Sequence, residues 1–184
     1  VRGLQPEDFV LKDEGRVRPI RQFAAESAAL DLVIAIDVSG SLRNAVDTLG
    51  RSAAEVMSKL AEGDRVALLT FAGDARVDLP LTADRAAAAA ALERLLREPL
   101  RPGTSLYQAA AAAAAVVSSD GGRPAVLMIT DNRSIEPRSR EADAVRALLR
   151  AGASLNVLVI PTAGPQRLAD GVRLPGLPRP EDLR

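Results

Sequence analysis

Oxygen-bearing side chains at three places in the chain could together bind a metal ion. The segment Asp37-Val38-Ser39-Gly40-Ser41 carries one carboxylate and two hydroxyls at alternate positions, Thr104 follows a glycine, and Asp131 follows the apolar segment 125–130. Carboxylate and hydroxyl oxygens are hard ligands, which suit a small hard cation such as Mg²⁺ or Mn²⁺. Since several of these ligands are neutral, the ion would remain electrophilic and could accept a further carboxylate from outside.

The composition excludes several other chemistries. The 184 residues include no cysteine and no histidine, which removes thiol nucleophiles, disulfides, Cys/His zinc sites and imidazole-based triads. With 24 basic and 24 acidic residues the net charge is zero, so we expect no nucleic-acid partner. The longest fully apolar stretch, 109–117, is far shorter than the about 20 residues that a bilayer requires, so no transmembrane segment is predicted in this chain.

The elements that would position the oxygen ligands alternate between strand and helix. Apolar segments at 32–36, 66–71, 125–130 and 155–160 have the length of strands buried on both faces. The segment 76–81 alternates between polar and apolar residues and contains Pro80, which predicts an antiparallel strand at the edge of the sheet.

Helices are predicted between these strands, over about 46–60, 82–96, 105–118 and 139–150. This order predicts an α/β fold, with a doubly wound, mostly parallel sheet that has one antiparallel edge strand and helices on both faces. In such sheets ligands bind beyond the carboxyl ends of the strands. We therefore expect the three loops with oxygen ligands to converge.

The two ends of the chain lie outside this pattern. Residues 1–30 predict a β-hairpin extension that turns at Asp13-Glu14-Gly15-Arg16 and docks on the main domain, 31–184, through apolar residues such as Phe9 and Leu11. The segment 172–174 could form a short final strand and Pro180 could begin a helix, inside which we expect the chain to stop. The chain opens at Val1 without a signal-peptide pattern, so we expect it to be part of a longer polypeptide.

A strand followed by D-x-S-x-S, then G-T, then an apolar strand ending in T-D resembles the metal-ion-dependent adhesion site of von Willebrand factor type A domains. The resemblance covers about 31–160 and implies a Rossmann-like fold. It implies that hydroxyls of Ser39, Ser41 and Thr104 bind the metal, while Asp37 and Asp131 act directly or through water. One position would remain for an acidic side chain of a partner. Asn132 stands where many members of this family have glycine.

The start of the chain carries a second, looser resemblance. The segment 6–15, PEDFVLKDEG, followed by Ile20 and Phe23, is similar to the lead-in of the VWFA-related bacterial proteins first grouped from Acidobacteria. Many of those proteins carry export signals. The resemblance therefore implies an extracytoplasmic protein, periplasmic or secreted.

Together these features predict a non-enzymatic interaction or adhesion module that binds an Asp or Glu of a partner protein through a divalent metal. One alternative is a metal-dependent phosphoryl hydrolase with Asp37 as nucleophile, but Ser39 occupies the usual position of its general acid, and the only lysines are Lys12 and Lys59. Another alternative is a structural subunit that docks to an ATPase and uses the same site. Taken singly, Asp37, Ser39 and Ser41 could also be helix caps.

Overall fold

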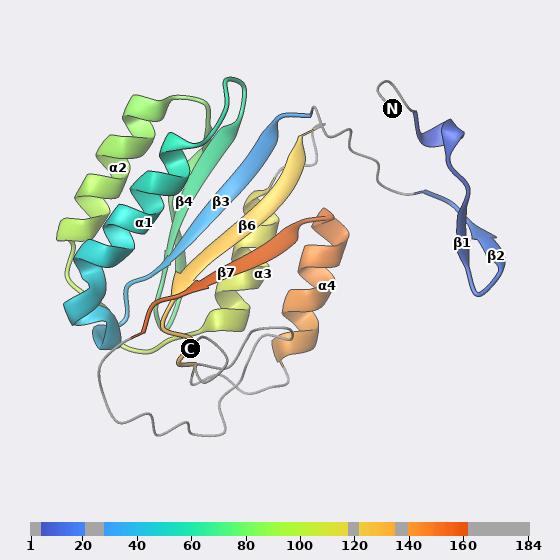
Figure 1. The fold of residues 1–184 in the computed structure, drawn as a ribbon. Coiled ribbons are helices and arrows are strands. Elements are labelled where there is room, and N and C mark those ends of the chain that lie inside the picture. The colour runs from blue at the N-terminus through green and yellow to red at the C-terminus, as the bar shows by residue number, and fades with distance from the viewer. Residues whose placement is uncertain (1–4, 21–27, 118–121, 135–139, 162–184) are drawn as a thin grey trace.

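A five-stranded sheet forms the centre of the computed structural model, which describes residues 5–20, 28–117, 122–134 and 140–161 (Figure 1). The strands are β3 (Leu30–Asp37), β4 (Arg65–Phe71), β5 (Ala75–Thr82), β6 (Arg123–Thr130) and β7 (Ser154–Val159). Their order across the sheet is β5-β4-β3-β6-β7, and only β5 runs antiparallel to its neighbour. The predicted α/β fold with one antiparallel edge strand is therefore confirmed.

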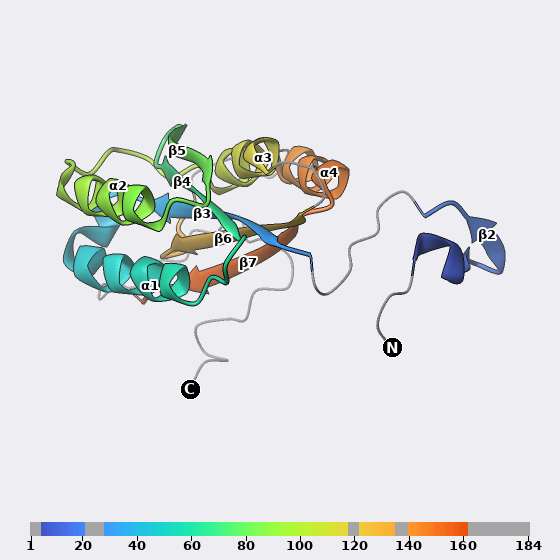
Figure 2. The same cartoon turned by 90° about the horizontal axis from the view of Figure 1, so that it is seen from above.

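Two helices cover each face of the sheet (Figure 2). α1 (Val46–Ser58) and α2 (Arg85–Arg97) pack on one face, and α3 (Leu106–Val116) and α4 (Glu141–Ala151) pack on the other. None of the helices in the described ranges is long and apolar enough to cross a membrane.

The core consists of two layers because alternate residues of each central strand point to opposite faces. In β3, Ile34 and Ile36 pack in the layer of α1 and α2, whereas Val33 and Ala35 pack in the layer of α3 and α4. The alanines that α3 turns toward the sheet are almost fully buried: Ala109, Ala110, Ala113 and Ala114. Small side chains allow this helix to lie close to the strands, which explains the alanine-rich sequence.

The edge strand β5 pairs with β4 through an interrupted register. It contains Pro80, from which its position at the edge was predicted. Proline has no amide hydrogen to donate, so it is tolerated at an edge where one side of the strand needs no partner. The predicted oxygen ligands lie at the end of β3 and in the loop after it, in the loop before α3, and in the loop after β6.

The chain changes face between the neighbouring strands β3 and β6. After β3 it continues into α1 on one face, and the helix that follows β6 in the chain, α4, lies on the other face. A crevice forms where neighbouring strands send their connections to opposite sides, and ligands of open α/β sheets bind there. Asp37 ends β3 and Asp131 follows β6, so both lie at this point.

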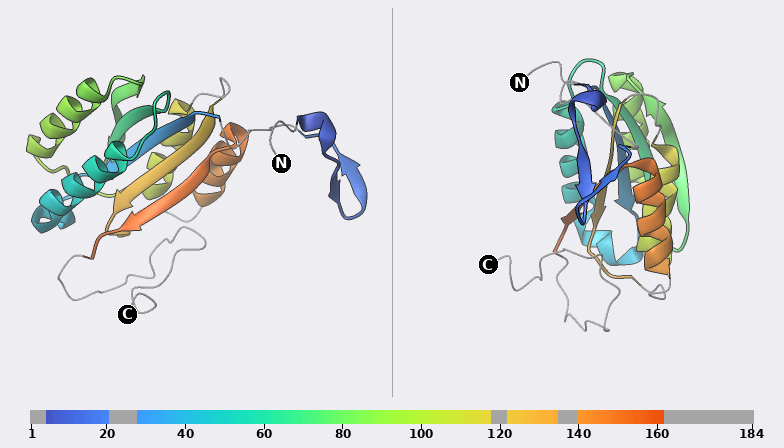
Figure 3. Two further views of the ribbon diagram at one scale, coloured as in Figure 1. Left: turned by 45° about the horizontal axis from the view of Figure 1, so that its top comes forward. Right: turned by 90° about the vertical axis from the view of Figure 1, so that its right-hand side faces the viewer.

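The predicted amino-terminal hairpin is present but does not pack as expected. A 3₁₀ helix, η1 (Pro6–Asp8), precedes β1 (Leu11–Asp13) and β2 (Arg16–Arg18), which pair antiparallel around Glu14 and Gly15, both with positive φ. Phe9 is 45% exposed and Leu11 50% exposed, and the hairpin stands apart from the sheet in Figure 1 and in the left view of Figure 3.

The expected docking of the hairpin through Phe9 and Leu11 is therefore wrong for the described residues. Each hairpin strand has only three residues, all exposed, and charged side chains occupy most of their positions. Phe23 and the predicted elements at 172–174 and 180–182 lie outside the described residues. The domain boundaries at 1–30 and 31–184 remain predictions.

Candidate metal centre

Asp37 ends the central strand with its side chain inside the protein. The residue is 1% exposed. Its Oδ1 accepts a hydrogen bond from the backbone N of Ser39 at 2.9 Å, and its Oδ2 accepts one from Oγ1 of Thr130 at 2.6 Å. Both carboxylate oxygens are thus oriented by neighbouring donors, and each retains a lone pair for a metal ion or its water.

The two serines of the first loop lie together. Oγ of Ser39 and Oγ of Ser41 are 3.0 Å apart, with Ser39 buried and Ser41 exposed. A 3₁₀ helix that the sequence reasoning missed, η2 (Gly40–Ala45), begins between them and turns the chain toward α1. The alternate spacing of the serines, combined with this tight turn, brings both hydroxyls to the same side of the loop.

The second loop is joined to the first through the backbone. Arg101 donates its backbone N–H to the carbonyl of Val38 at 2.9 Å. Gly103 has a φ of +83°, a left-handed conformation that favours glycine, and leads into Thr104, which is 5% exposed. Ser105 then bonds to the loop after β4, with its backbone N 2.7 Å from the carbonyl oxygen of Ala72. These bonds hold Thr104 at the edge beside the first loop.

The third loop places Asp131 beside the other two. The side chain of Asp131 is 1% exposed, and its Oδ1 accepts a hydrogen bond from the backbone N of Arg133 at 3.2 Å. Oγ of Ser134 lies 3.2 Å from the carbonyl oxygen of Thr104, which ties this loop to the second. The predicted convergence of three loops at one edge is therefore found.

Asn132 explains how the third loop is built without the glycine that the family resemblance led us to expect. Its φ is +59°, in the left-handed region that asparagine adopts more readily than most residues. Its backbone N donates to Oγ1 of Thr130 at 3.1 Å. Asparagine therefore satisfies the same conformational requirement as glycine, and the turn after Asp131 is kept.

Negative charge is concentrated at this edge. Burial raises the pKa of the Asp37 carboxyl above its ordinary value, hydrogen bonds from Ser39 and Thr130 act in the opposite direction, and the negative charge of Asp131 adds to the increase. A cation between the two carboxylates would remove both the desolvation cost and the repulsion. The donor set of two buried carboxylates and neighbouring hydroxyls fits a hard divalent ion.

No group of three or more His, Cys, Asp or Glu residues that could hold a metal occurs among the residues that the structure describes. This agrees with the composition of the candidate centre, because only two of its five predicted ligands are carboxylates. A site of this kind depends on hydroxyl ligands and water to complete the coordination.

The sequence reasoning assigned no role to two residues of the centre, although Thr130 belongs to the T-D pattern. Thr130 is fully buried and links Asp37 to the turn at Asn132 through one hydroxyl. The sequence signal for this role was that Thr130 is the one hydroxyl residue at the end of an otherwise apolar strand. Arg133 pairs with Asp131, with Nε 3.7 Å from Oδ2, and nothing in the spacing of the motif distinguished this arginine from the others.

Comparisons with known proteins agree with this architecture. The profile of the von Willebrand factor type A domain matches residues 32–134. A comparison with curated proteins gives no match. Among solved structures, BatB from Bacteroides thetaiotaomicron has a TM-score of 0.62 and 25% identity, over 71% of this chain and 66% of that chain.

Two further structures share the fold. An aerotolerance-related membrane protein from Bacteroides fragilis has a TM-score of 0.63 and 26% identity, over 80% of this chain and 83% of that chain. The manganese-loaded TRAP protein of Plasmodium vivax has a TM-score of 0.62 and 17% identity, over 72% of this chain and 57% of that chain. Because the profile covers more than half of the residues and includes all five predicted ligands, the chain belongs to the von Willebrand factor type A domain family.

Proposed function

We propose that this chain is a non-enzymatic interaction module that binds an Asp or Glu side chain of a partner protein through Mg²⁺ or Mn²⁺. The metal ligands in this proposal are Asp37, Ser39, Ser41, Thr104 and Asp131. The observation that carries the proposal is the convergence of three loops at one edge of the sheet, where the side chains of Asp37 and Asp131 are buried and hydroxyl-bearing residues lie beside them.

Each residue has a defined part in the proposed binding. The backbone N of Ser39 and the hydroxyl of Thr130 orient the carboxylate of Asp37, so that this carboxylate need not be reorganised when a cation arrives. Ser39 and Ser41 present neighbouring hydroxyl oxygens. The bound divalent ion would supply an electrophilic position for a carboxylate oxygen of the partner. The manganese-loaded TRAP structure, which shares the fold, supports this choice of metal class.

The alternative of a phosphoryl hydrolase is disfavoured by the environment of Asp37. As the nucleophile, this carboxylate would have to reach a phosphorus atom, yet the residue is 1% exposed. The position two residues later holds Ser39, which cannot serve as a carboxylic general acid. An ATPase subunit that docks to this chain would use the same metal site. Such a subunit is therefore one of the partners that the proposal includes.

The proposed setting is outside the cytoplasm. One structural neighbour supports this placement, since the aerotolerance-related protein from Bacteroides fragilis is described as a membrane protein. The similarity of segment 6–15 to the VWFA-related proteins first grouped from Acidobacteria points the same way.

Thermal melts in EDTA and in excess Mg²⁺ or Mn²⁺ test the metal site. An ion at about 100 times its Kd stabilises the folded state by about 2.7 kcal/mol, which raises Tm by about 5–10 °C in a protein of this size. Asp37→Asn should remove this increase while leaving the Tm in EDTA unchanged or higher, because the buried negative charge is gone. Asp47→Asn, at an exposed carboxylate of α1, is the matched control and should keep the increase.

Partner binding is tested separately. Thr104→Ala and Asp131→Ala should abolish metal-dependent capture of a partner and still leave a folded domain, because both residues lie in loops at the edge of the sheet. Capture that is unchanged by EDTA and by both substitutions would place the binding surface elsewhere. Turnover of a generic phosphoester that depends on Asp37 would instead favour the hydrolase.

A further inference from the structure

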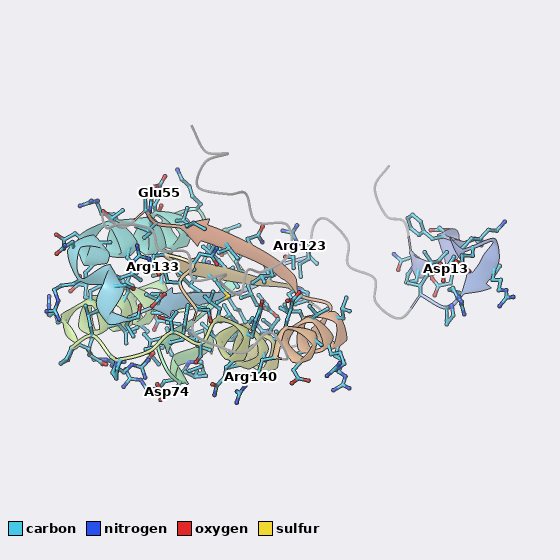
Figure 4. The ribbon with its side chains drawn as sticks, turned by 90° about the horizontal axis from the view of Figure 1, so that it is seen from below. Asp13, Glu55, Asp74, Arg123, Arg133 and Arg140 are labelled. Carbon is cyan, nitrogen blue, oxygen red and sulfur yellow. The ribbon has the colours of Figure 1, made fainter. Side chains whose placement is uncertain are left out.

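Arg133 contacts the carboxylate of Asp131 in two ways. Its backbone N lies 3.2 Å from Oδ1, and its guanidinium Nε lies 3.7 Å from Oδ2. In Figure 4 the labelled Arg133 lies near the carboxyl ends of the parallel strands. Arg123, which begins β6, lies toward their amino ends. A positively charged side chain therefore stands directly beside one of the predicted metal ligands.

The two members of this ion pair differ in exposure. The side chain of Asp131 is 1% exposed, whereas that of Arg133 is 45% exposed. The carboxylate is thus buried, while the arginine side chain paired with it is partly exposed to solvent. An acidic group that binds close to Asp131 would therefore also lie close to the positive charge of Arg133.

A guanidinium at this place has opposite effects on the binding of the metal ion and on the binding of the partner's carboxylate. It repels a divalent cation that binds to Asp131, and it competes with that cation for the carboxylate. It attracts an incoming carboxylate, with which its planar donors can form charge-assisted hydrogen bonds. The same side chain should therefore weaken metal binding and strengthen binding of the acidic partner.

We propose that Arg133 is a specificity-determining residue of this site, which pairs with Asp131 in the metal-free protein and with the partner's carboxylate in the metal-loaded protein. This inference rests on the proposed function. The carboxylate of a partner would then be recognised by its charge at two places, the metal and the guanidinium. An uncharged partner group, such as an amide oxygen, would interact with the metal but would gain no charge–charge interaction with the guanidinium.

The test measures two affinities in the whole chain. Mn²⁺ binding is measured by the relaxation of water protons, and binding of N-acetyl-aspartate amide to the Mn²⁺-loaded protein is measured by the loss of bound water, with the neutral N-acetyl-asparagine amide as control. For Arg133→Gln we expect Mn²⁺ to bind about two- to fivefold more tightly. We expect the aspartate compound to bind at least about fivefold more weakly, and the asparagine compound to be unaffected.

Two further variants separate charge from geometry. Arg133→Lys keeps the charge but loses the planar donors, so Mn²⁺ affinity should stay near that of the wild type while aspartate binding falls in part. Arg140→Gln removes another exposed arginine, located just before α4, and should change neither affinity. Melts in EDTA check that all three variants fold.

The outcomes distinguish this inference from the function on which it rests. If wild-type protein does not bind Mn²⁺, both are overturned. If wild-type protein binds Mn²⁺ and the aspartate compound, but Arg133→Gln leaves both affinities unchanged or shifts them in the same direction, only the role of Arg133 is overturned. An equal effect of Arg140→Gln would also overturn it, because the effect would then reflect the net charge of the protein.

Discussion

At the scale of single residues, the candidate centre is built by side chains that perform structural tasks as well as presenting oxygen atoms. One hydroxyl, that of Thr130, donates to Asp37 and accepts from the backbone of Asn132. It therefore connects the loop after β3 to the loop after β6. Asn132 in turn supplies the left-handed backbone that aims Asp131 at the same edge.

The conformation of Asn132 leads to a prediction about stability. Its Oδ1 is buried without a hydrogen-bond partner among the described residues, and both Asn132→Gly and Asn132→Ala remove that atom. Only glycine adopts a φ of +59° without steric cost, so Asn132→Gly should be more stable than Asn132→Ala by about 1 kcal/mol. Urea unfolding in EDTA measures the difference. Equal stability of the two variants would show that the backbone relaxes out of the left-handed region.

At the scale of elements, the register of the central strands is held at the end opposite the candidate centre. Asp31 of β3 is 1% exposed and receives two hydrogen bonds of 2.7 Å from the guanidinium of Arg65, at the start of β4. Gly122 lies against this pair, because a Cβ there would come within 2.6 Å of Oδ2 of Asp31. This ion pair aligns the starts of β3 and β4. Through the register of the two strands, it also sets the position of Asp37 at the end of β3.

Removal of Arg65 should therefore cost stability. Arg65→Met would leave the buried carboxylate of Asp31 without its guanidinium, at a cost of about 1–3 kcal/mol. Arg97→Met breaks an exposed ion pair with Glu93 and should cost less than about 0.5 kcal/mol. Chemical denaturation checks both values. Mn²⁺ affinity should be the same in both variants, and a large loss of affinity in Arg65→Met would contradict the separation of the two ends of the sheet.

At the scale of the whole molecule, the hairpin and the α/β domain differ in how they bury apolar surface. The domain has two core layers of almost fully buried side chains. The hairpin leaves Phe9, Leu11 and Val17 between 45% and 69% exposed. Apolar side chains that remain in solvent contribute little to the free energy of unfolding.

Deletion of residues 1–24 should therefore leave Tm within about 2 °C of the parent protein, with calorimetry as the measurement. Ala28 and Ala29 are retained, and their carbonyl oxygens still accept from Arg123. Phe71→Ala, which opens a cavity in the core, is the comparison and should cost about 3–5 kcal/mol. A deletion that lowers Tm by as much as Phe71→Ala would show that the hairpin packs on the domain.

The sequence alone determined the order of the elements and the edge of the sheet at which the predicted ligands lie. Apolar segments of strand length alternate with helical stripes, and this periodicity is a local property that burial on both faces requires. The motif residues Asp37, Ser39 and Ser41 follow the first of these strands, so their place at the carboxyl edge followed from the topology.

Only the tertiary structure decided the packing of the hairpin and the partners of the ligands. Whether Phe9 is buried depends on a complementary surface elsewhere in the chain, which no local pattern reports. The contact of Thr130 with Asp37 joins the ends of two neighbouring strands that are far apart in the sequence, and the contact of Arg133 with Asp131 depends on the left-handed turn at Asn132 between them. Periodicity is therefore readable from the chain, whereas the pairing of individual side chains across loops depends on how the elements finally pack.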